Sequence, residues 1–561
     1  MPSNRSASPI ALAIAAALAL PVTAFAQDTL GQANPGQAGN DASDSKTLST
    51  VVVTGSNIRR AEAEASNPVQ VISREELATT AKATVGDYLR SLSANTGNAS
   101  NETQNSGWSS GAAGIGLRGL SQKNTLVLLN GRRLANYGFP NGGLSDTFVN
   151  INALPLVAVE RIEVLKDGAS AIYGSDAIAG VINIITRQNF EGLEVGGSAG
   201  IADQGGLQTQ RARVVGGFGD LDTDRYNVFF SLEGYNRERL DQDERDLTRS
   251  GIYTDLPGGR WNGWSARGAR FLIDGASVPV LDGNGHCPDG MTLTASAPID
   301  GLAGDTCAIN LAPYTTLIPA TERYQAFARG TFRLTDSVDA FAEVLYSRMR
   351  GESIFGSSPY FTLEPGRFAL NADTGLAEGV PSILPAANPY NPYGRDVELH
   401  YTFFDLGQSL KTNRSDAWRV LTGLRGSGER WDWEFAGFAA RSKEREVVAG
   451  GFANRYGLFA ALQNGTYNLH DPSATPQSVI DSIALSTLRP ADSKLQGLDF
   501  KLSGEIAQFR GRSVGFATGV EWRSESLVSL NPWQIDAGLQ IRPAIAEVDG
   551  SREVAATYAE L

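Results

Sequence analysis

The sequence is poor in the residues that build catalytic and metal sites, with two cysteines and three histidines in 561 residues. The histidines, His286, His400 and His470, are scattered through predicted loops, and no spaced His/Cys set accompanies them. The motifs HExxH and GxSxG and any catalytic Cys/His arrangement are absent. We therefore expect no enzyme activity, no metal site and no cofactor.

Long hydrophobic runs are also missing beyond the first 26 residues. Because a transmembrane helix needs about 18 or more apolar residues in a row, a membrane protein with this sequence must be a β-barrel. The 62 glycines and the aromatic content of 8% suit a barrel with a wet interior, and they suit a soluble secreted β-protein equally well. The formal charge of −13 argues against nucleic acid as a partner.

Residues 1–26 are typical of a signal peptide. Arg5 supplies a positive start, the apolar stretch 10–20 is short for a membrane span, and Ala24-Phe25-Ala26 fits the small-x-small cleavage rule. A membrane anchor is the alternative interpretation.

Cys287 and Cys307 share one segment rich in glycine and aspartate. In an exported chain such a pair is predicted to form a disulfide that closes a loop. Metal binding would require further ligands, which the surrounding sequence does not supply.

Residues 27–55 predict a flexible leader that ends in an extended β-branched segment, Thr50-Val51-Val52-Val53-Thr54. Such a segment can add as a strand to the open sheet edge of a partner. From the residues alone, the simpler interpretation is the first strand of the next domain.

Residues 56–188 predict a compact α/β unit interrupted by two polar loops, 95–111 and 137–143. A capping box that begins at Ser73 opens a helix, and Asn130-Gly131 is the preferred turn of a tight hairpin. The expected elements are strands at 68–72, 125–129, 132–134, 159–165 and 181–186, and helices that begin at 73 and 84.

The segment Gly114-Ile115-Gly116-Leu117-Arg118-Gly119 matches the dinucleotide-binding pattern GxGxxG literally. That interpretation requires a strand before the motif and a helix after it. Here a Ser/Gly loop precedes it and a hairpin follows, so we expect these glycines to allow close backbone packing instead.

From about Leu193 onward the hydrophobic period changes to two, and residues 189–561 are expected to form the barrel part. Val514, Phe516, Val520 and Trp522, for example, alternate with small and charged residues. Apolar-out and polar-in alternation over about ten residues is the pattern of transmembrane barrel strands.

Connection lengths support the same fold. Short turns are predicted at 219–224, 335–337, 426–429 and 510–512, and long loops at 239–321, 351–414, 449–493 and 529–551. Strict alternation of short and long connections is required by a barrel with short periplasmic turns and long outer loops, but not by a soluble sandwich. Counting 397–404 as a membrane strand would break this alternation, so we expect an extracellular ribbon there.

The pattern gives about nine complete strands and a tenth that begins at Val554 and stops at Leu561. A barrel that holds a plug of this size needs on the order of 22 strands. We therefore expect a fragment of a longer protein, with a transmembrane β-barrel that is incomplete in this chain and an N-terminal α/β plug domain.

Several motifs in this order resemble the TonB-dependent outer-membrane receptors. They are TVVVTG (50–55), GLRG (116–119), LLNGRR (128–133), VERIEVLK (159–166), YGS (173–175) and GVINI (180–184). The chain departs from that family's pattern in lacking the second half of the barrel and its C-terminal aromatic strand.

The resemblance implies that Thr50, Val51, Val52, Val53 and Thr54 form the TonB box, which pairs with a TonB-type inner-membrane energy transducer. It implies a receptor in the outer membrane of a Gram-negative bacterium, surrounded by lipid, that takes up a scarce large substrate actively. A siderophore, a vitamin and an oligosaccharide are not distinguished. The alternative is a plugged pore or adhesin without energised transport.

Ligand contacts are expected on the two polar loops of the plug. Trp108, Tyr137 and Phe139 are candidates to stack on a sugar or on an aromatic group of the ligand, and Asn101, Gln104 and Asn105 are candidate hydrogen-bonding residues. The alternative is that these residues are solvated loop tips.

Overall fold

The computed structural model describes residues 54–58, 69–80, 82–96, 100–103, 109, 111–141, 146–255, 263–354, 359–509, 512–542 and 547–561. The predicted signal peptide lies outside these ranges, as do Thr50, Val51, Val52, Val53, Gln104, Asn105 and Trp108. None of the helices within the described ranges is long and apolar enough to span a bilayer.

The N-terminal unit, here called the plug, contains a five-stranded sheet in the order β1-β4-β5-β2-β3. Strands β2 and β5 run parallel and the other pairs run antiparallel. Its elements are β1 (Val69–Ser73), α2 (Arg74–Thr79), α3 (Val85–Arg90), β2 (Thr125–Leu129), β3 (Arg132–Arg133), β4 (Val159–Leu165), α4 (Ser170–Tyr173) and β5 (Gly180–Thr186).

Local chemistry explains where the plug helices begin. The side chain of Ser73 accepts a hydrogen bond from the backbone N–H of Glu76, and Thr84 caps α3 in the same way through Asp87. Each cap satisfies a backbone donor that the first helical turn leaves without a partner. Both helices therefore begin next to the residues that the sequence indicates.

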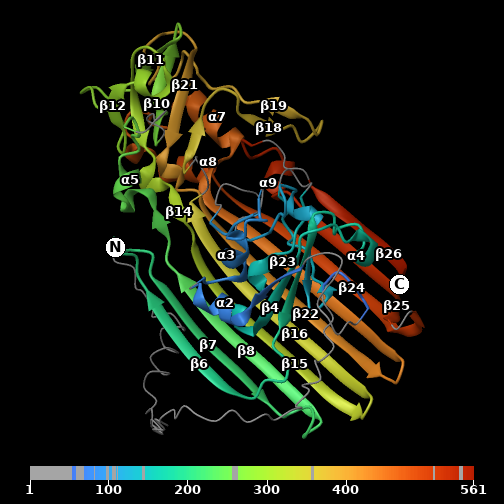
Figure 1. The fold of residues 1–561 in the computed structure, drawn as a ribbon. Coiled ribbons are helices and arrows are strands. Elements are labelled where there is room, and N and C mark those ends of the chain that lie inside the picture. The colour runs from blue at the N-terminus through green and yellow to red at the C-terminus, as the bar shows by residue number, and fades with distance from the viewer. Residues whose placement is uncertain are drawn as a thin grey trace, which may run out of the picture.

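The C-terminal part forms a curved ten-stranded antiparallel sheet, here called the barrel sheet, in the order β26-β25-β24-β23-β22-β16-β15-β8-β7-β6. Figure 1 shows its long tilted strands side by side, and the sheet does not close on itself. The strands are β6 (Gly192–Gly200), β7 (Thr209–Phe218), β8 (Tyr226–Arg237), β15 (Ala320–Thr335), β16 (Val338–Ile354), β22 (Leu410–Ser427), β23 (Trp431–Ala453), β24 (Ala484–Phe509), β25 (Arg512–Ser529) and β26 (Val548–Glu560).

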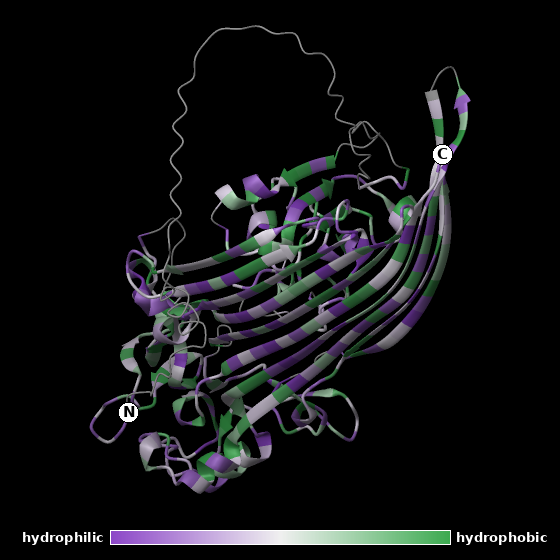
Figure 2. Ribbon diagram, turned by 90° about the horizontal axis from the view of Figure 1, so that it is seen from below, coloured by the Kyte–Doolittle hydropathy of each residue, from purple (hydrophilic) through white to green (hydrophobic). Residues whose placement is uncertain are grey.

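Hydropathy alternates along these strands, as the bands of purple and green in Figure 2 show. In β16, Phe341, Glu343 and Leu345 are buried on the inner face, whereas Val344 and Tyr346 are exposed on the outer face. This is the arrangement of an incomplete transmembrane β-barrel, with an apolar outer face and a mixed inner face.

The barrel strands run past the region of apolar alternation. The tenth strand, β26, begins at Val548 rather than at the predicted Val554, and the long connections shorten to 238–319, 355–409, 454–483 and 530–547. The sequence prediction was wrong at these ends because backbone ladder bonds continue between polar residues such as Ser526 and Ser551. The ends with short turns and with long connections are called the short-turn end and the long-loop end below.

The long connections build a second sheet at the long-loop end, here called the loop sheet, which stands apart from the barrel sheet in Figure 1. It contains seven strands, five of them in the order β12-β13-β10-β21-β17, and it includes the segment predicted as an extracellular ribbon, as β21. The strands are β10 (Trp264–Ile273), β11 (Ala276–Pro279), β12 (Thr292–Ala295), β13 (Asp305–Asn310), β17 (Phe361–Leu363), β20 (Ile383–Leu384) and β21 (Val397–Phe403).

Smaller elements complete the long connections. Helices α7 and α8 contribute buried residues such as Leu458 and Ile480 to the hydrophobic core of the loop sheet. These elements are β9 (Leu240–Asp241), α5 (Asp246–Arg249), α6 (Ala297–Asp300), β14 (Thr316–Ile318), β18 (Phe368–Leu370), β19 (Ala377–Gly379), α7 (Arg455–Asn464), α8 (Gln477–Ile483) and α9 (Trp533–Asp536).

The plug lies on the concave face of the barrel sheet (Figure 2). Its core, which includes Leu89 and Ile162, is continuous with inward-facing residues of the barrel strands, among them Phe229, Phe327 and Leu345. The plug is therefore attached to the barrel sheet by a shared hydrophobic core as well as by the polar contacts described next.

Candidate functional site

The plug hairpin between β2 and β3 points at the inner face of the barrel sheet. Asn130 and Gly131 have φ values of 51° and 78°. Two successive positive φ values are those of a type I′ turn, which Asn-Gly favours. The turn pairs Leu129 with Arg132 and brings the side chains of Asn130 and Arg132 to the barrel sheet.

Arg132 is the main ionic contact of this hairpin. Its Nε and Nη2 atoms donate to the two carboxylate oxygens of Asp499 on β24 at 2.8 and 2.9 Å, and Nη2 also lies 2.5 Å from Glu434 on β23. The side chains of Arg132 and Asp499 are each 7% exposed. A two-pronged guanidinium–carboxylate pair combines strength with a fixed geometry, and burial limits screening by salt.

Glu343 on β16 is the second ionic contact below the hairpin. It accepts a hydrogen bond of 2.8 Å from the Asn130 side chain of the plug. Arg419 on β22 donates to it at 3.1 Å, and Arg329 on β15 lies 3.2 Å away. Two arginines of the barrel sheet, here also called the wall, thus compensate the charge of the buried Glu343 carboxylate, which at the same time binds the plug turn.

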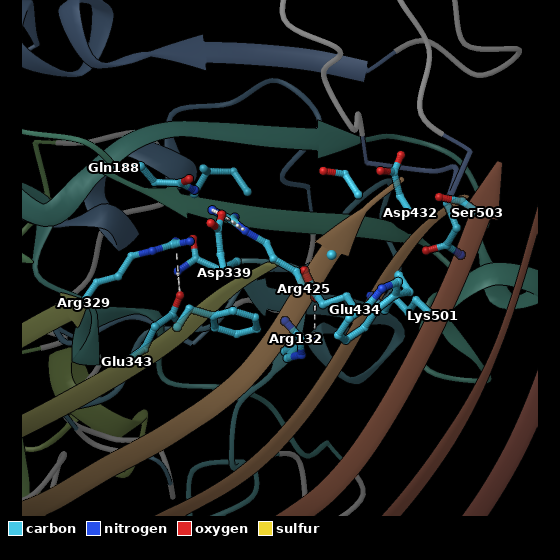
Figure 3. Close-up of a pocket in the computed structure, with 18 of the residues that line it drawn as sticks. Arg132, Gln188, Arg329, Asp339, Glu343, Arg425, Asp432, Glu434, Lys501 and Ser503 are labelled. Atoms are coloured by element: carbon cyan, nitrogen blue, oxygen red, sulfur yellow. Dashed lines mark hydrogen bonds and ion pairs between the residues drawn. The ribbon is translucent and has the colours of Figure 1, made fainter. Parts of the chain in front are cut away.

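A cavity of about 730 Å³ lies between this hairpin and the short-turn end of the barrel sheet. Its lining is rich in charged side chains, which converge in Figure 3 from the plug (Arg132) and from the barrel strands (Glu343, Arg425, Glu434 and Lys501). The plug therefore leaves a polar space beside its ionic contacts with the wall.

Glu102 ties the 95–111 loop to the wall at the long-loop end. Its carboxylate accepts hydrogen bonds from Arg323 on β15 at 2.6 Å, from Arg237 on β8 at 2.9 Å and from Asn152 at 2.9 Å. Burial raises the pKa of Glu102, but the charges of Arg323 and Arg237 outweigh it, so the pKa lies below its ordinary value. The neighbouring candidate Asn101 is half-buried and donates to Thr103 at 2.7 Å.

Tyr137 and Phe139 are not the exposed loop aromatics that the sequence predicts. Both rings are 1% exposed, and they pack with Phe148 and Ala491 in one buried cluster. Between them, the backbone N–H of Gly138 donates to Glu444 on β23 at 2.9 Å. The rings are buried because this short Gly-containing segment approaches the wall closely.

The residue that ends the predicted TonB box is fixed to the plug sheet. The N–H and the hydroxyl of Thr54 donate to the same oxygen of the buried Glu163 at 3.0 and 2.5 Å. Asn183 donates to the Thr54 hydroxyl at 3.1 Å, and the N–H of Gly55 donates to Tyr173 at 3.2 Å. Burial raises the pKa of Tyr173 to about 12, so this phenol stays protonated.

The next two residues contact the barrel sheet near its short-turn end. The hydroxyl of Ser56 and the N–H of Asn57 donate to the carboxylate of Glu560 on β26 at 2.6 and 2.8 Å. The chain that follows the predicted box is therefore held by both the plug and the barrel sheet.

Gly114 and Gly116 have the packing role expected from the sequence. An added Cβ would lie 2.1 Å from Gln122 at Gly114 and 2.6 Å from the Leu120 carbonyl at Gly116. Strand β2 follows after one short 3-10 turn, so the helix of a dinucleotide site is not there. The described residues contain no group of three or more His, Cys, Asp or Glu side chains that is suited to hold a metal.

The loop sheet contains a disulfide between Cys287 and Cys307, with a Cα–Cα distance of 5.6 Å. Cys307 is fully buried in the core of that sheet. The bond closes a segment of 20 residues that includes β12.

Sequence reasoning missed the ionic contacts of the plug with the wall. In the sequence, Asp499 and Glu434 are charged positions of alternating strands and Arg132 follows the Asn-Gly turn, but no local pattern pairs them. The available signal was a charged residue directly after the Asn-Gly turn together with acidic residues on lumen-facing positions.

Residues 61–181 match a protein family described as the TonB-dependent Receptor Plug Domain. An iron-regulated outer membrane virulence protein of Vibrio cholerae is 33% identical over 191 residues, which are 33% of this chain and 25% of that protein. The vitamin B12 transporter BtuB of Vibrio cholerae is 31% identical over 198 residues, 35% of this chain and 30% of the transporter. The matched region is thus less than a third of either relative.

Solved structures are similar at lower identity. The siderophore receptor PirA from Acinetobacter baumannii has a TM-score of 0.43 and 16% identity, over 82% of this chain and 48% of the receptor. The ferric yersiniabactin uptake receptor FyuA from Yersinia pestis has a TM-score of 0.38 and 12% identity, over 88% of this chain and 61% of the receptor.

Proposed function

From its membership of the TonB-dependent receptor family, we propose that this chain serves the active uptake of a scarce large substrate across the outer membrane of a Gram-negative bacterium. The observation that carries the proposal is the position of the two ends of the plug. The loop that contains Glu102 contacts the ends of β8 and β15 at the long-loop end, whereas Thr54 lies at the short-turn end. One small domain thus connects the two sides of the membrane.

The ligand side of this proposal is the long-loop end. Glu102 of the plug and the loop sheet lie there, and we propose Asn101, Gln104, Asn105 and Trp108 as ligand contacts. Since Tyr137 and Phe139 are buried, we propose that they support the ligand-binding surface from within and do not contact the ligand. Siderophores, vitamins and oligosaccharides all remain within the proposed substrate class, and one relative is a vitamin B12 transporter.

The transducer side is the short-turn end. Residues 50–54 are proposed to add as a strand to a TonB-type inner-membrane energy transducer. The contacts of Thr54 with Glu163 and of Ser56 with Glu560 fix the chain just after this segment. A pull on the segment would therefore act directly on β4 of the plug.

Movement of the plug requires its contacts with the wall to break. Two such contacts lie beside the cavity: the buried pair of Arg132 with Asp499, and the half-buried contact of Asn130 with Glu343. Because each is local and polar, water in the 730 Å³ cavity can solvate the separated charges as the hairpin moves. In the proposed mechanism, the force derived from the inner membrane breaks these contacts and opens a path for the substrate.

The proposal is tested with cells that carry the full-length gene, its deletion or single variants. Deletion is expected to abolish growth on one scarce chelate, vitamin or glycan when that nutrient is limiting. Undiminished uptake of every such nutrient tested would contradict a transport role.

The box is tested with Val52→Pro, because proline removes a ladder donor and clashes with strand pairing. We expect uptake to stop while ligand binding to the cells persists. Ala42→Pro in the leader, outside the predicted box, is the matched control and should transport normally. Normal uptake in the Val52→Pro variant would show that the box lies elsewhere.

A plugged pore or adhesin without energised transport is the alternative function. It predicts that ligand binding or passive flux persists unchanged when the proton gradient is collapsed. Active uptake predicts that accumulation stops under the same treatment.

A further inference from the structure

The outer face of the barrel sheet carries an uneven distribution of charge. On the four adjacent strands β16, β22, β23 and β24, the middle of this face is apolar and includes the exposed Val344, Val420, Phe435 and Leu498. Toward the long-loop end it is bordered by Tyr346 and Trp418, which are 37% and 40% exposed and face each other across β16 and β22. Aromatic side chains at such a border mark the interface between hydrocarbon and lipid headgroups.

Beside and beyond these aromatic residues, the same face is strongly basic. Successive outward positions are arginine or lysine on β16 and β23, β22 and β24 each contribute one more, and the registers place these strands side by side. These residues, here called the basic belt, are Arg348, Arg350, Arg414, Arg441, Lys443, Arg445 and Lys494.

Carboxylates on this part of the outer face are fewer than the cations. Asp416 contacts Arg348 and Arg414, at 2.6 and 2.8 Å. Asp492 binds Arg441 at 2.5 Å and lies 4.0 Å from Lys494, while Glu352 lies 3.6 Å from Arg350. Glu322 on β15 lies opposite Arg350 in the register of β15 with β16, so seven cations face four carboxylates.

Lys443 and Arg445 are the least compensated members of the belt. Neither forms an ion pair with any residue that the structure describes, and both side chains are exposed. Lys443 lies between Asp416 and Asp492 in the two strand registers, whereas Arg445 lies between Arg414 and Pro490. The exposed surplus of positive charge is therefore centred on Arg445.

The belt lies at the depth of lipid headgroups. A tilted strand crosses the hydrocarbon core with about 9–11 residues, and β22 uses about ten between Trp418 and its end at Ser427. Arg414 and Asp416 precede Trp418 on that strand, one to two pleats beyond the hydrocarbon. Cations at this level meet the phosphates of the adjoining leaflet.

We propose that the basic belt is a binding surface for the phosphate groups of membrane-lipid headgroups in the leaflet at the long-loop end. Guanidinium groups present planar forks that match phosphate oxygens, and the belt offers five of them around two ammonium groups. Bound lipid phosphates would neutralise the surplus charge where the apolar face ends. This surface depends on the membrane position of the barrel sheet and goes beyond the proposed uptake function.

The experiment measures lipid binding to the full chain purified in detergent, by native mass spectrometry. The probes are phosphatidic acid, phosphatidylcholine and inorganic phosphate. We expect phosphatidic acid to bind at least about tenfold more tightly than phosphatidylcholine, and binding to weaken by about tenfold or more in Lys443→Gln/Arg445→Gln. Similar affinity of the double variant and the unchanged chain would overturn the proposal.

Two control variants are used. One keeps the charges of the belt while changing its side chains, and the other removes two charges elsewhere on the chain. Lys443→Arg/Arg445→Lys keeps the charges and should keep the affinity. Arg249→Gln/Arg395→Gln removes the same charge from exposed sites on the long connections, at side chains that are 62% and 59% exposed, and should bind as the unchanged chain does. Equal losses in this control would indicate a general charge effect and would count against the belt.

Inorganic phosphate distinguishes a lipid surface from a site for soluble phosphate. We expect millimolar phosphate to leave phosphatidic acid bound, because the acyl chains lie on the apolar face beside the belt. Complete displacement would overturn the assignment to lipid. Since the measurement involves neither a transducer nor a nutrient, its failure and a failure of the proposed uptake are observed separately.

Discussion

Arg132 of the plug and Asp499 of the barrel sheet form a buried two-pronged ion pair, although 367 positions separate them in the chain. The Asn130-Gly131 turn positions the arginine, and the lumen-facing register of β24 positions the aspartate. The pair therefore links the tightest local turn of the plug to one of the longest strands of the wall.

Arg132→Ala is expected to loosen the plug hairpin. The change leaves the buried carboxylate of Asp499 without its guanidinium partner, and loss of one partner from a buried pair costs about 3–5 kcal/mol. Hydrogen exchange of the β2–β3 amides in the full chain should therefore accelerate by about a hundredfold to a few thousandfold. Arg90→Ala, which removes an exposed pair on α3, is the control and should change exchange very little. Unchanged protection in the Arg132 variant would contradict the assigned role.

Glu102 predicts a pH dependence of the contact between the 95–111 loop and the wall. Its folded pKa lies below the ordinary value of 4.5, so the ionised carboxylate stabilises the folded state above pH 4.5. This stabilisation is lost as the pH falls through the folded pKa. Urea denaturation of the full chain between about pH 3 and 7 should show this loss, and Glu102→Gln should reduce it. Parallel stability curves for both proteins would refute the prediction.

Gly138→Ala is expected to displace the 137–141 segment from the wall. An added Cβ would lie 2.0 Å from the Glu444 carboxylate and 2.9 Å from Ala491, and forced overpacking costs about 1–3 kcal/mol. Chemical denaturation measures the loss. At Gly283 an added Cβ meets nothing within 4 Å, so Gly283→Ala should be close to neutral. Equal stability of the two variants would show that the wall yields at Glu444.

Removal of the Cys287–Cys307 bond is expected to destabilise the loop sheet and to leave the plug unaffected. The bond closes 20 residues, and a loop of about that length contributes about 3 kcal/mol in the chain-entropy model. The double variant Cys287→Ala/Cys307→Ala should lose protection from exchange in β10 and β13 but not in β4. Dithiothreitol should reproduce the effect in the unchanged chain and should do nothing further to the variant.

The elements with strong local signals could be predicted from the sequence. The Asn130-Gly131 turn, the caps at Ser73 and Thr84 and the alternation in β25 each depend on neighbouring residues alone, so the sequence reveals them. The ends of the barrel strands could not be predicted, because ladder bonds beyond the membrane need no apolar pattern. This is why the start of β26 was placed at Val554 rather than at Val548.

The candidate site was predicted less well, for a related reason. Tyr137 and Phe139 stand in a Gly- and Asn-containing segment that is typical of an exposed loop, and only the approach of Gly138 to Glu444 buries them. The partners of Arg132 and Glu102 on the barrel strands are 135 to 367 residues away in the chain. Such contacts follow from how the plug sits against the barrel sheet, which no local pattern encodes.

The loop sheet combines strands from two different connections with helices from a third. Its pieces are separated in the chain by complete β-hairpins of the barrel sheet, so their contacts are highly non-local. Such contacts close late because the intervening chain must first be ordered. The loop sheet is therefore expected to be the last part to assemble. It can form only after the preceding barrel hairpins have inserted in the correct order.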